Sequence, residues 1–486
     1  MTVHRVRASL ASLCGVAALI AFGCATNPVT GRHQFSLVTP SQEIQIGRDG
    51  HAAILKEYGA YEDPRLQAYV DSVGQALAKV SHLPDLEWHF TVLDDPAVNA
   101  FALPGGYIYI TRGILAHLNS EAQLAGVLGH EIGHVTARHS AGRISQQQVA
   151  GLGLGLASLF SESFRRYSDA AQSALGLLFL KYGRQDETQA DELGVQYSLR
   201  AGYDPREIPS TYAMLKRVGE RSGQRLPAFL STHPDPGDRE NRTRALAGQA
   251  TAGKSGLAIR GRGYVQRLEA VVYGEDPRHG YFDGVRFYHP DLGFEMKFPD
   301  GWKTQNAREA VTAAEPNSRA QMQLTLADAG TLSPSGFVSQ LQRGGQIAGS
   351  DGRSENVGGF AAWLGSFEVT TQTGTPSILA AALIRKSDQQ MFQVLGRSAA
   401  PGDADEARIF SSARSFRALI DPVKLAAQPD RLHVLSVSRS GTFAEVVSRV
   451  SPMAISVEDA SILNNLQPDE NVLTGQVLKV VQPGKR

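Results

Sequence analysis

The sequence predicts an α+β protein: a mainly helical first half with a small sheet, then an α+β region, then a short strand–helix–helix–strand segment. Three observations predict this class. Helical spacing of apolar residues dominates the first half, strand-like alternation is frequent in the middle, and the last part alternates around two short helical runs. We therefore expect a leader at residues 1–23, a tether at 24–39, and domains at 40–285, 286–420 and 430–483.

The amino terminus has the pattern of a secretory signal. Arg5 and Arg7 precede an apolar run that continues to Phe22, and this run is too short to remain as a bilayer-spanning anchor. We therefore expect the leader to be removed from the mature protein.

Cys24 is the expected site of lipidation, because the small residue before this cysteine resembles a bacterial lipobox. Ordinary signal cleavage nearby is the alternative. Cys14, inside the leader, is the only other cysteine, so the mature chain would hold no thiol pair for a disulfide. Ala25 favours attachment to the outer membrane, by resemblance to enteric lipoproteins, with the chain in the periplasm.

The segment after the tether predicts helices at residues 40–58 and 64–80, a strand at 88–93, and a loop followed by a second strand within 99–110. Gly105 and Gly106 let the backbone come near a ligand. The strand that starts at Tyr107 could present an edge with which an extended peptide pairs. The alternative is that this strand is simply a member of the sheet.

The most informative motif is His-Glu-x-x-His, formed by His130, Glu131 and His134. Ser120 and Gln123 predict a capping box, so the motif lies in the middle of a helix. There, His130 and His134 project from one face a turn apart and can bind one metal ion. Glu131 lies off the ligand axis, close enough to take a proton from a metal-bound water. An amphipathic helix with solvated histidines is the alternative.

Three glycines, Gly126, Gly129 and Gly133, lie on one side of this helix. Each costs the helix about 1 kcal/mol relative to Ala, and we expect close approach of another backbone to compensate. The helix expected at residues 168–200 has a matching face of small residues that also carries two carboxylates.

Glu187 is the best candidate for a third ligand, since a hydrolytic zinc site normally has three protein ligands and one open position. Two neutral imidazoles and one carboxylate leave such a site with a net charge of about +1, which favours bound hydroxide near neutral pH. Asp191, one turn later, can accept a hydrogen bond from the free N–H of a liganding histidine. A solvated acidic face is the alternative for both residues.

These motifs resemble a family of zinc metallopeptidases that includes the CaaX prenyl protease, the HtpX membrane heat-shock peptidase and soluble periplasmic lipoproteases. Two further stretches match that family in the same order: residues 99–110 before the histidine helix, and Thr232-His233-Pro234 followed by Arg239 after the third ligand. The resemblance covers roughly residues 27–250. It implies a mainly helical zincin fold of the gluzincin type.

The resemblance implies one Zn²⁺ per chain, bound by His130, His134 and Glu187. It implies that Glu131 is the general base. It also implies that His233 donates a hydrogen bond to the reaction's oxyanion or covers the metal at rest. Arg239 would orient a carboxylate or stabilise the developing charge, and Asn99 would contact substrate. The other histidines, among them His117 and His139, are expected to be structural. For His139 the reason is its position five residues after His134, which takes it off the ligand face of the helix.

The later domains carry fewer chemical signals. Residues 286–420 predict a separate α+β domain of unassigned role that resembles PsbP-like sandwiches and has no catalytic constellation. Residues 430–483 resemble a LysM module, a kind of domain that binds peptidoglycan glycans in many bacterial proteins, although Ser440-Gly441 stands where Gly-Asp is usual. A structural or protein-docking module is the alternative.

Composition excludes some functions. Basic and acidic side chains are equal at 48 each, which gives no general attraction to nucleic acid. The longest apolar run after the leader, residues 151–160, is too short to span a bilayer and predicts a flap or core hairpin. With the resemblance, the sequence predicts a lipid-anchored zinc endopeptidase that acts on unfolded or misassembled envelope proteins. A chaperone or adaptor for outer-membrane assembly and a peptidoglycan-binding scaffold are the alternatives.

Overall fold

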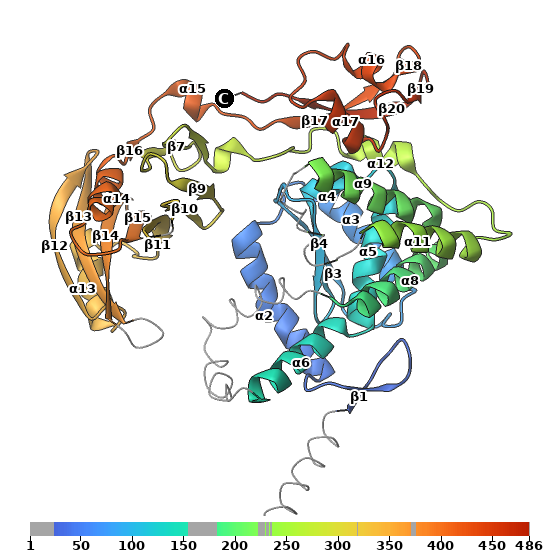
Figure 1. The fold of residues 1–486 in the computed structure, drawn as a ribbon, viewed down its shortest axis with the longest axis horizontal. Helices are drawn as coiled ribbons and strands as arrows, with labels where there is room; N and C mark the ends of the chain where they lie inside the picture. The colour runs from blue at the N-terminus through green and yellow to red at the C-terminus, as the bar shows by residue number, and fades with distance from the viewer. Residues whose placement is uncertain are drawn as a thin grey trace, which may run out of the picture. The chain divides into compact units, whose positions relative to one another are not determined.

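The computed structural model describes residues 24–153, 182–221, 229, 233, 236–317, 319–370 and 376–485. The chain forms two compact units (Figure 1). One unit combines Met1–Gly274 with Asp430–Pro483, and the other contains Glu275–Pro429 with Gly484–Arg486. The leader, the start of the helix expected at 168–200 and most of the 151–160 run lie outside the described residues. Helices of the described part are all too short or too polar to cross a membrane.

The tether of the first unit begins with a short hairpin of β1 (Cys24–Thr26) and β2 (His33–Phe35). The helix α2 (Pro40–Tyr58) follows, started by a Thr39 capping box, and then α3 (Pro64–Ala78), capped by Asp63. Lipidation of Cys24, which lies at the first position of β1, stays a prediction.

A three-stranded sheet lies between helices of the first unit (Figure 1). Its strands are β3 (His89–Leu93), β4 (Ala100–Leu103) and β5 (Tyr107–Thr111). Because side chains alternate along a strand, Phe101 and Tyr109 pack with Ile54 of α2, whereas Ala100 and Ile110 join the main core beside α3 and α5 (Glu121–Thr136). The buried sheet therefore supports the helix that carries the histidine motif.

The expected edge at Tyr107 is wrong, because β5 is the central strand. It pairs in parallel with β3 on one side and antiparallel with β4 on the other, so its backbone groups are already used. The two glycines before it serve packing. A Cβ on Gly105 would lie 2.6 Å from the Cα of Ile44, and one on Gly106 would lie 2.5 Å from the carbonyl oxygen of Glu87.

The helices around the site follow the sheet. The short α4 (Arg112–His117) leads into α5, and α6 (His139–Gly153) follows it. Later come α8 (Arg184–Arg200), the 3₁₀ turn η3 (Pro205–Glu207), α9 (Ile208–Arg221), α11 (Pro236–Ala250) and α12 (Gly261–Arg267). Ser120 caps α5 by accepting from the Gln123 backbone, but the Gln123 side chain accepts from Asn119, so the expected capping box is only half formed.

The second unit is built on an antiparallel seven-stranded sheet in the order β12-β13-β14-β15-β11-β10-β9. The strands are β9 (Lys303–Asn306), β10 (Ala310–Ala314), β11 (Gln321–Ala327), β12 (Gly349–Val357), β13 (Phe360–Thr370), β14 (Pro376–Ser387) and β15 (Gln390–Arg397). The helix α13 (Pro334–Arg343) packs in one apolar core with Trp363, and α14 (Ala404–Arg414) packs in the other with Leu364. Adjacent residues of β13 point to opposite faces, so the two helices cover opposite sides of the sheet.

Shorter elements complete the second unit. A small sheet in the order β16-β8-β7-β6 consists of β6 (Tyr281–Asp283), β7 (Arg286–His289), β8 (Phe294–Lys297) and β16 (Arg417–Ala418), with η4 (Pro277–His279) before it and α15 (Pro422–Leu425) after it.

The carboxy-terminal segment has the strand–helix–helix–strand order that its sequence predicts. Its elements are β17 (Arg431–Ser436), β18 (Gly441–Thr442), α16 (Phe443–Val447), α17 (Val457–Leu463), β19 (Asn471–Val472) and β20 (Val477–Gln482). The outer strands β17 and β20 pair antiparallel, and the segment belongs to the first compact unit.

Candidate metal centre

Four buried side chains converge in the first unit: His130, His134, Glu187 and His233. One nitrogen or oxygen from each lies within 4.8 Å of all the others. The Nε2 atoms of His130 and His134 are 3.0 Å apart, and His233 Nδ1 lies 2.9 Å from Glu187 Oε1. The structure thus brings together residues that are up to 103 positions apart in the chain.

Close packing of two helices creates this convergence. Both motif histidines lie on α5, and Glu187 lies in the first turn of α8. A Cβ on Gly129 would lie 3.2 Å from the carbonyl oxygen of Gly194, and one on Gly133 would lie 3.2 Å from the Cα of Ala190. The expected backbone approach is therefore confirmed for these two glycines. Gly126 instead faces the side chain of Ile208.

The residues fit a divalent metal ion. Imidazole nitrogens and a carboxylate oxygen are the ligands that zinc prefers in hydrolytic sites. Several buried polar atoms here, both Glu131 oxygens and His233 Nε2, have no hydrogen-bond partner among the described residues. Buried polar atoms without a partner are costly unless another group satisfies them. A cation held by His130, His134 and Glu187, with a solvent molecule beside Glu131, would satisfy these atoms.

Glu131 has the environment of a proton acceptor. Its side chain is fully buried, and its Oε1 lies 3.7 Å from His233 Nε2. Burial raises the pKa of the Glu131 carboxyl above its usual value, and the neighbouring His233 and His130 oppose this rise. A general base works best when its pKa is near the operating pH, so a raised carboxyl pKa suits Glu131 to this role near neutral pH.

Asp191 and Arg239 orient the ligands from behind. Asp191 Oδ1 lies 3.1 Å from His130 Nδ1, so the other nitrogen of that ring faces the cluster. Arg239 Nη1 lies 2.7 Å from Glu187 Oε2, and its Nη2 lies 2.6 Å from Asp191 Oδ1. The Tyr212 hydroxyl donates to Asp191 Oδ1 at 2.6 Å and accepts from Arg239 at 2.8 Å.

These contacts set the charges of the site. Burial alone would raise the pKa of Glu187, but His233 and Arg239 outweigh it and hold the pKa at about 2. Burial would also raise the pKa of Asp191, and Arg239 and His130 bring it below its usual value instead. Both carboxylates are therefore ionised near neutral pH. Burial, with the positive neighbours, lowers the pKa of His134 far below its usual value, which keeps a nitrogen lone pair free for a metal.

Arg239 lies in the helix α11. The structure begins α11 at Pro236, so Arg239 is in the first turn of that helix. From there its guanidinium reaches Glu187 and Asp191, an arrangement that orients carboxylates. His233 belongs to the ligand cluster itself, and its Nδ1 lies 3.4 Å from His130 Nε2 and 2.9 Å from Glu187 Oε1.

Sequence reasoning missed a partner of His134. His139 Nδ1 lies 3.0 Å from His134 Nδ1, and His139 Nε2 lies 3.0 Å from Gln189 Oε1. The five-residue spacing placed His139 off the ligand face only if one helix continued. In the structure α5 ends at Thr136 and Arg138 turns the chain with a φ of 59°. No glycine marks that turn, so the sequence carried little signal for it.

Tyr182 and Asn99 complete the surroundings. The Tyr182 ring stacks on His134 with centroids 3.9 Å apart, and its hydroxyl lies 2.9 Å from Ser140 Oγ. Asn99 precedes the edge strand β4, and its buried Oδ1 has no hydrogen-bond partner among the described residues. Substrate contact by Asn99, Gly105, Gly106 and Tyr107 stays a prediction.

Comparison with known proteins identifies the domain that contains this cluster. Residues 64–247 match the model of peptidase family M48. These residues, which contain the cluster, are similar to that family and are called the M48 domain below. The resemblance seen in the motifs is thereby confirmed at the level of this family, while the lipoprotein branch and the LysM-like module stay predictions.

Several curated proteins are similar to the M48 domain. The mitochondrial metalloendopeptidase OMA1 of Arabidopsis thaliana is 35% identical over 206 residues, covering 42% of this chain and 40% of that protein. The Schizosaccharomyces pombe protein of the same name is 33% identical over 212 residues, covering 43% and 61%. The beta-barrel assembly-enhancing protease of Escherichia coli K12 is 30% identical over 244 residues, covering 48% and 50%. The chain thus spans 40 to 61% of the length of these relatives.

A solved structure of cyanobacterial PsbP from Synechocystis sp. PCC 6803 also matches, with 15% identity and a TM-score of 0.22 over 29% of this chain and 98% of that one. Similarity at this level carries no argument about the second unit, whose role stays unassigned.

Proposed function

We propose that this protein is a zinc-dependent endopeptidase of the bacterial cell envelope. The convergence of His130, His134 and Glu187 beside a buried Glu131 carries the proposal, and the M48 match supports it. Such a site has the three protein ligands and the adjacent carboxylate that hydrolysis of a peptide bond requires.

Each residue around the site has a separate role in the proposed reaction. Zinc at this site would supply a Lewis acid that lowers the pKa of water. Glu131, with its raised pKa, accepts the proton of the attacking water and returns it to the leaving amine. His233, whose pKa is raised because the charges of Glu187 and Glu131 outweigh the effect of burial, places its Nε2 3.7 Å from Glu131 Oε1 and would donate a hydrogen bond to a developing oxyanion. Asp191 and Arg239 keep His130 and Glu187 in position.

We further propose unfolded or misassembled envelope proteins as the substrates. The E. coli relative's name, beta-barrel assembly-enhancing protease, supports a role in envelope protein assembly. The expected leader and the lipidation of Cys24 support a location in the periplasm on a membrane, with the outer membrane favoured.

The test is the variant Glu131→Gln in the full chain. An amide cannot act as the general base but preserves size, so we expect zinc content like that of the wild type and a loss of cleavage of about 10²- to 10⁴-fold. Cleavage of an unfolded protein such as casein would be followed by gel, with Glu192→Gln on the exposed face of α8 as the control. Cleavage by Glu131→Gln at the wild-type rate would reject this mechanism.

A second candidate is an adaptor or chaperone for outer-membrane assembly that cleaves little. The burial of the whole ligand cluster, His233 included, favours it, since substrate must first gain access. The same Glu131→Gln variant separates the two functions in cells. If it rescues every defect of a deletion strain, proteolysis is not the main activity; if it rescues none, the adaptor function is rejected.

A further inference from the structure

The carboxy-terminal segment is joined to the M48 domain by a buried lysine. Lys479 on β20 has no exposed surface, and its Nζ donates to the carbonyl oxygens of Ala116 and Leu118 at 2.6 Å each. These carbonyls lie at the end of α4, where backbone acceptors lack partners within the helix. Burial lowers the pKa of the Lys479 amine far below its usual value, and either protonation state offers the two donors.

Further contacts join the same segment to α9. Arg217 Nη2 donates to Ser461 Oγ at 2.8 Å, and Arg221 Nε donates to Asp459 Oδ1 at 2.8 Å. Both acceptors lie on α17. On the apolar side, three residues of the segment lie in the main core of the M48 domain: Leu432, Leu463 and Val481. Residues 430–483 are therefore packed as part of this domain, not as a freely hanging module.

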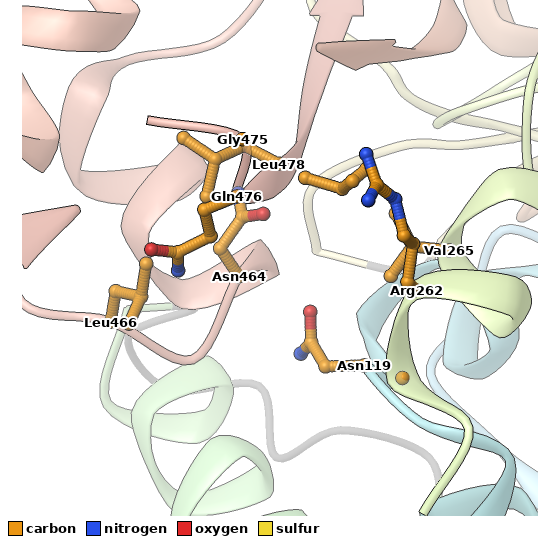
Figure 2. Close-up of a pocket in the computed structure, with 10 residues that line it drawn as sticks. Asn119, Arg262, Val265, Asn464, Leu466, Gly475, Gln476 and Leu478 are labelled. Atoms are coloured by element: carbon orange, nitrogen blue, oxygen red, sulfur yellow. The ribbon is translucent and has the colours of Figure 1, made fainter. Parts of the chain in front are cut away.

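The interface between residues 430–483 and the rest of the first unit, called the seam below, is incompletely packed at one end. A cavity of about 340 Å³ lies between the two parts, lined among others by Asn119, Arg262, Asn464 and Gln476 (Figure 2). Asn464 exchanges hydrogen bonds of 2.8 Å with the backbone of Lys479, and Asn119 donates to the Leu463 carbonyl at 3.3 Å. Of these hydrogen bonds, the one from Asn119 crosses between the two parts, beside the cavity.

Two of the helices that the segment contacts, α4 and α9, support the metal centre. The helix α4 leads directly into α5, which carries His130 and His134. The helix α9 carries Tyr212, whose hydroxyl bonds both Asp191 and Arg239 behind the ligands. A shift of either helix would therefore move groups that orient the ligands.

We propose that residues 430–483 clamp α4 and α9, and that Lys479 is a positioning residue for the metal centre. The segment thereby contributes to metal retention, a role distinct from glycan binding. This inference rests on the proposed zinc site, and the test below separates a failure of one from a failure of the other.

The first test compares full-length Lys479→Met with Lys216→Met, which removes an exposed lysine from α9 itself. Loss of hydrogen bonds to a buried amine leaves two carbonyls unsatisfied, so we expect zinc release to a chelator to accelerate by roughly tenfold or more. Hydrogen exchange at the end of α4 and along α9 should accelerate with it, while β13 and β14 of the second unit keep their protection. Zinc release and exchange at wild-type rates in Lys479→Met would overturn the proposal.

A charge-reversal cycle covers the case in which Lys479→Met does not fold. Arg221→Asp and Asp459→Arg each place like charges across the seam, and the double variant restores an attractive pair at the surface. We expect each single variant to release zinc roughly two- to fivefold faster, and the double variant to return toward the wild-type rate. A purely local fold defect would show no such rescue, and its absence counts against the clamp.

The exchange measurement distinguishes the two proposals. If the wild-type chain binds no zinc, the proposed function fails. Hydrogen exchange along α9 in metal-free Lys479→Met and Lys216→Met then still decides whether residues 430–483 hold that helix in place.

Discussion

Gly133 of α5 lies against Ala190 of α8 so closely that a methyl group on Gly133 would be 3.2 Å from the Ala190 Cα and carbonyl oxygen. Few real Cβ atoms have such close neighbours, so the two backbones are in contact at this point. Glu187 lies one turn before Ala190, and His134 follows Gly133. The metal centre therefore depends on a contact between two helix backbones.

Gly133→Ala should separate these helices slightly. The added methyl must displace α8, and we expect a loss of about 1–3 kcal/mol in the free energy of unfolding together with weaker zinc binding. Chemical denaturation and zinc titration of the purified protein would measure both. Gly142→Ala on α6 is the matched control, because nothing lies within 4 Å of its Cβ position and the helix propensity of Ala should make it neutral or stabilising. Equal effects of the two substitutions would contradict the packing argument.

Tyr212→Phe should weaken zinc binding without unfolding the protein. The substitution removes the hydroxyl that donates to Asp191 and accepts from Arg239, and so loosens the groups that orient His130 and Glu187. Loss of a group behind the ligands typically lowers metal affinity by about 10- to 100-fold. Tyr281→Phe removes another buried hydroxyl, on β6 of the second unit, and should leave zinc affinity unchanged. Competition with a chelating dye would give both affinities.

His117 should make the M48 domain less stable in mild acid. Burial lowers the pKa of His117 to about 4 from an ordinary value of 6.5, and its hydrogen bond to the Gly113 carbonyl opposes the shift only in part. Between pH 6.5 and about pH 4, His117 is therefore protonated in the unfolded chain but neutral in the folded chain. The contribution is fully present above pH 6.5 and is lost as the pH falls to about 4, a loss of about 2–3 kcal/mol.

The measurement is the denaturation midpoint between pH 7 and pH 4 for His117→Gln, with the exposed His33→Gln as control. The first variant should lose less stability than the wild type over this range, because the titrating ring is gone. A pH dependence identical in all three proteins would show that His117 is not the source.

The local part of the site was predictable from sequence. The spacing of His130 and His134, the glycines beside them and the carboxylate face of Glu187 all follow from helix periodicity, which depends only on neighbours in the chain. M48 similarity and the buried cluster agree with that expectation.

Other features depend on tertiary packing and left little trace in the sequence. The central place of Tyr107 arises because β3, which precedes β4 in the chain, pairs in parallel with the free side of β5. His139 returns to His134 through a turn without glycine, and Lys479 reaches α4 from more than 360 positions away. Each is set by long-range contacts that residue patterns do not encode.

Zinc content of the purified mature protein, compared with Glu187→Ala and Glu192→Ala, tests the central claim most directly. Both substitutions remove a glutamate from α8, but Glu187 lies in the buried cluster and Glu192 is exposed. We expect about one zinc ion per chain in the wild type and in Glu192→Ala after dialysis, and far less in Glu187→Ala, since a site that loses one of three ligands binds weakly. Equal zinc content in all three proteins would contradict the assignment of Glu187 as a ligand, and no zinc in any of them would contradict the metal centre itself.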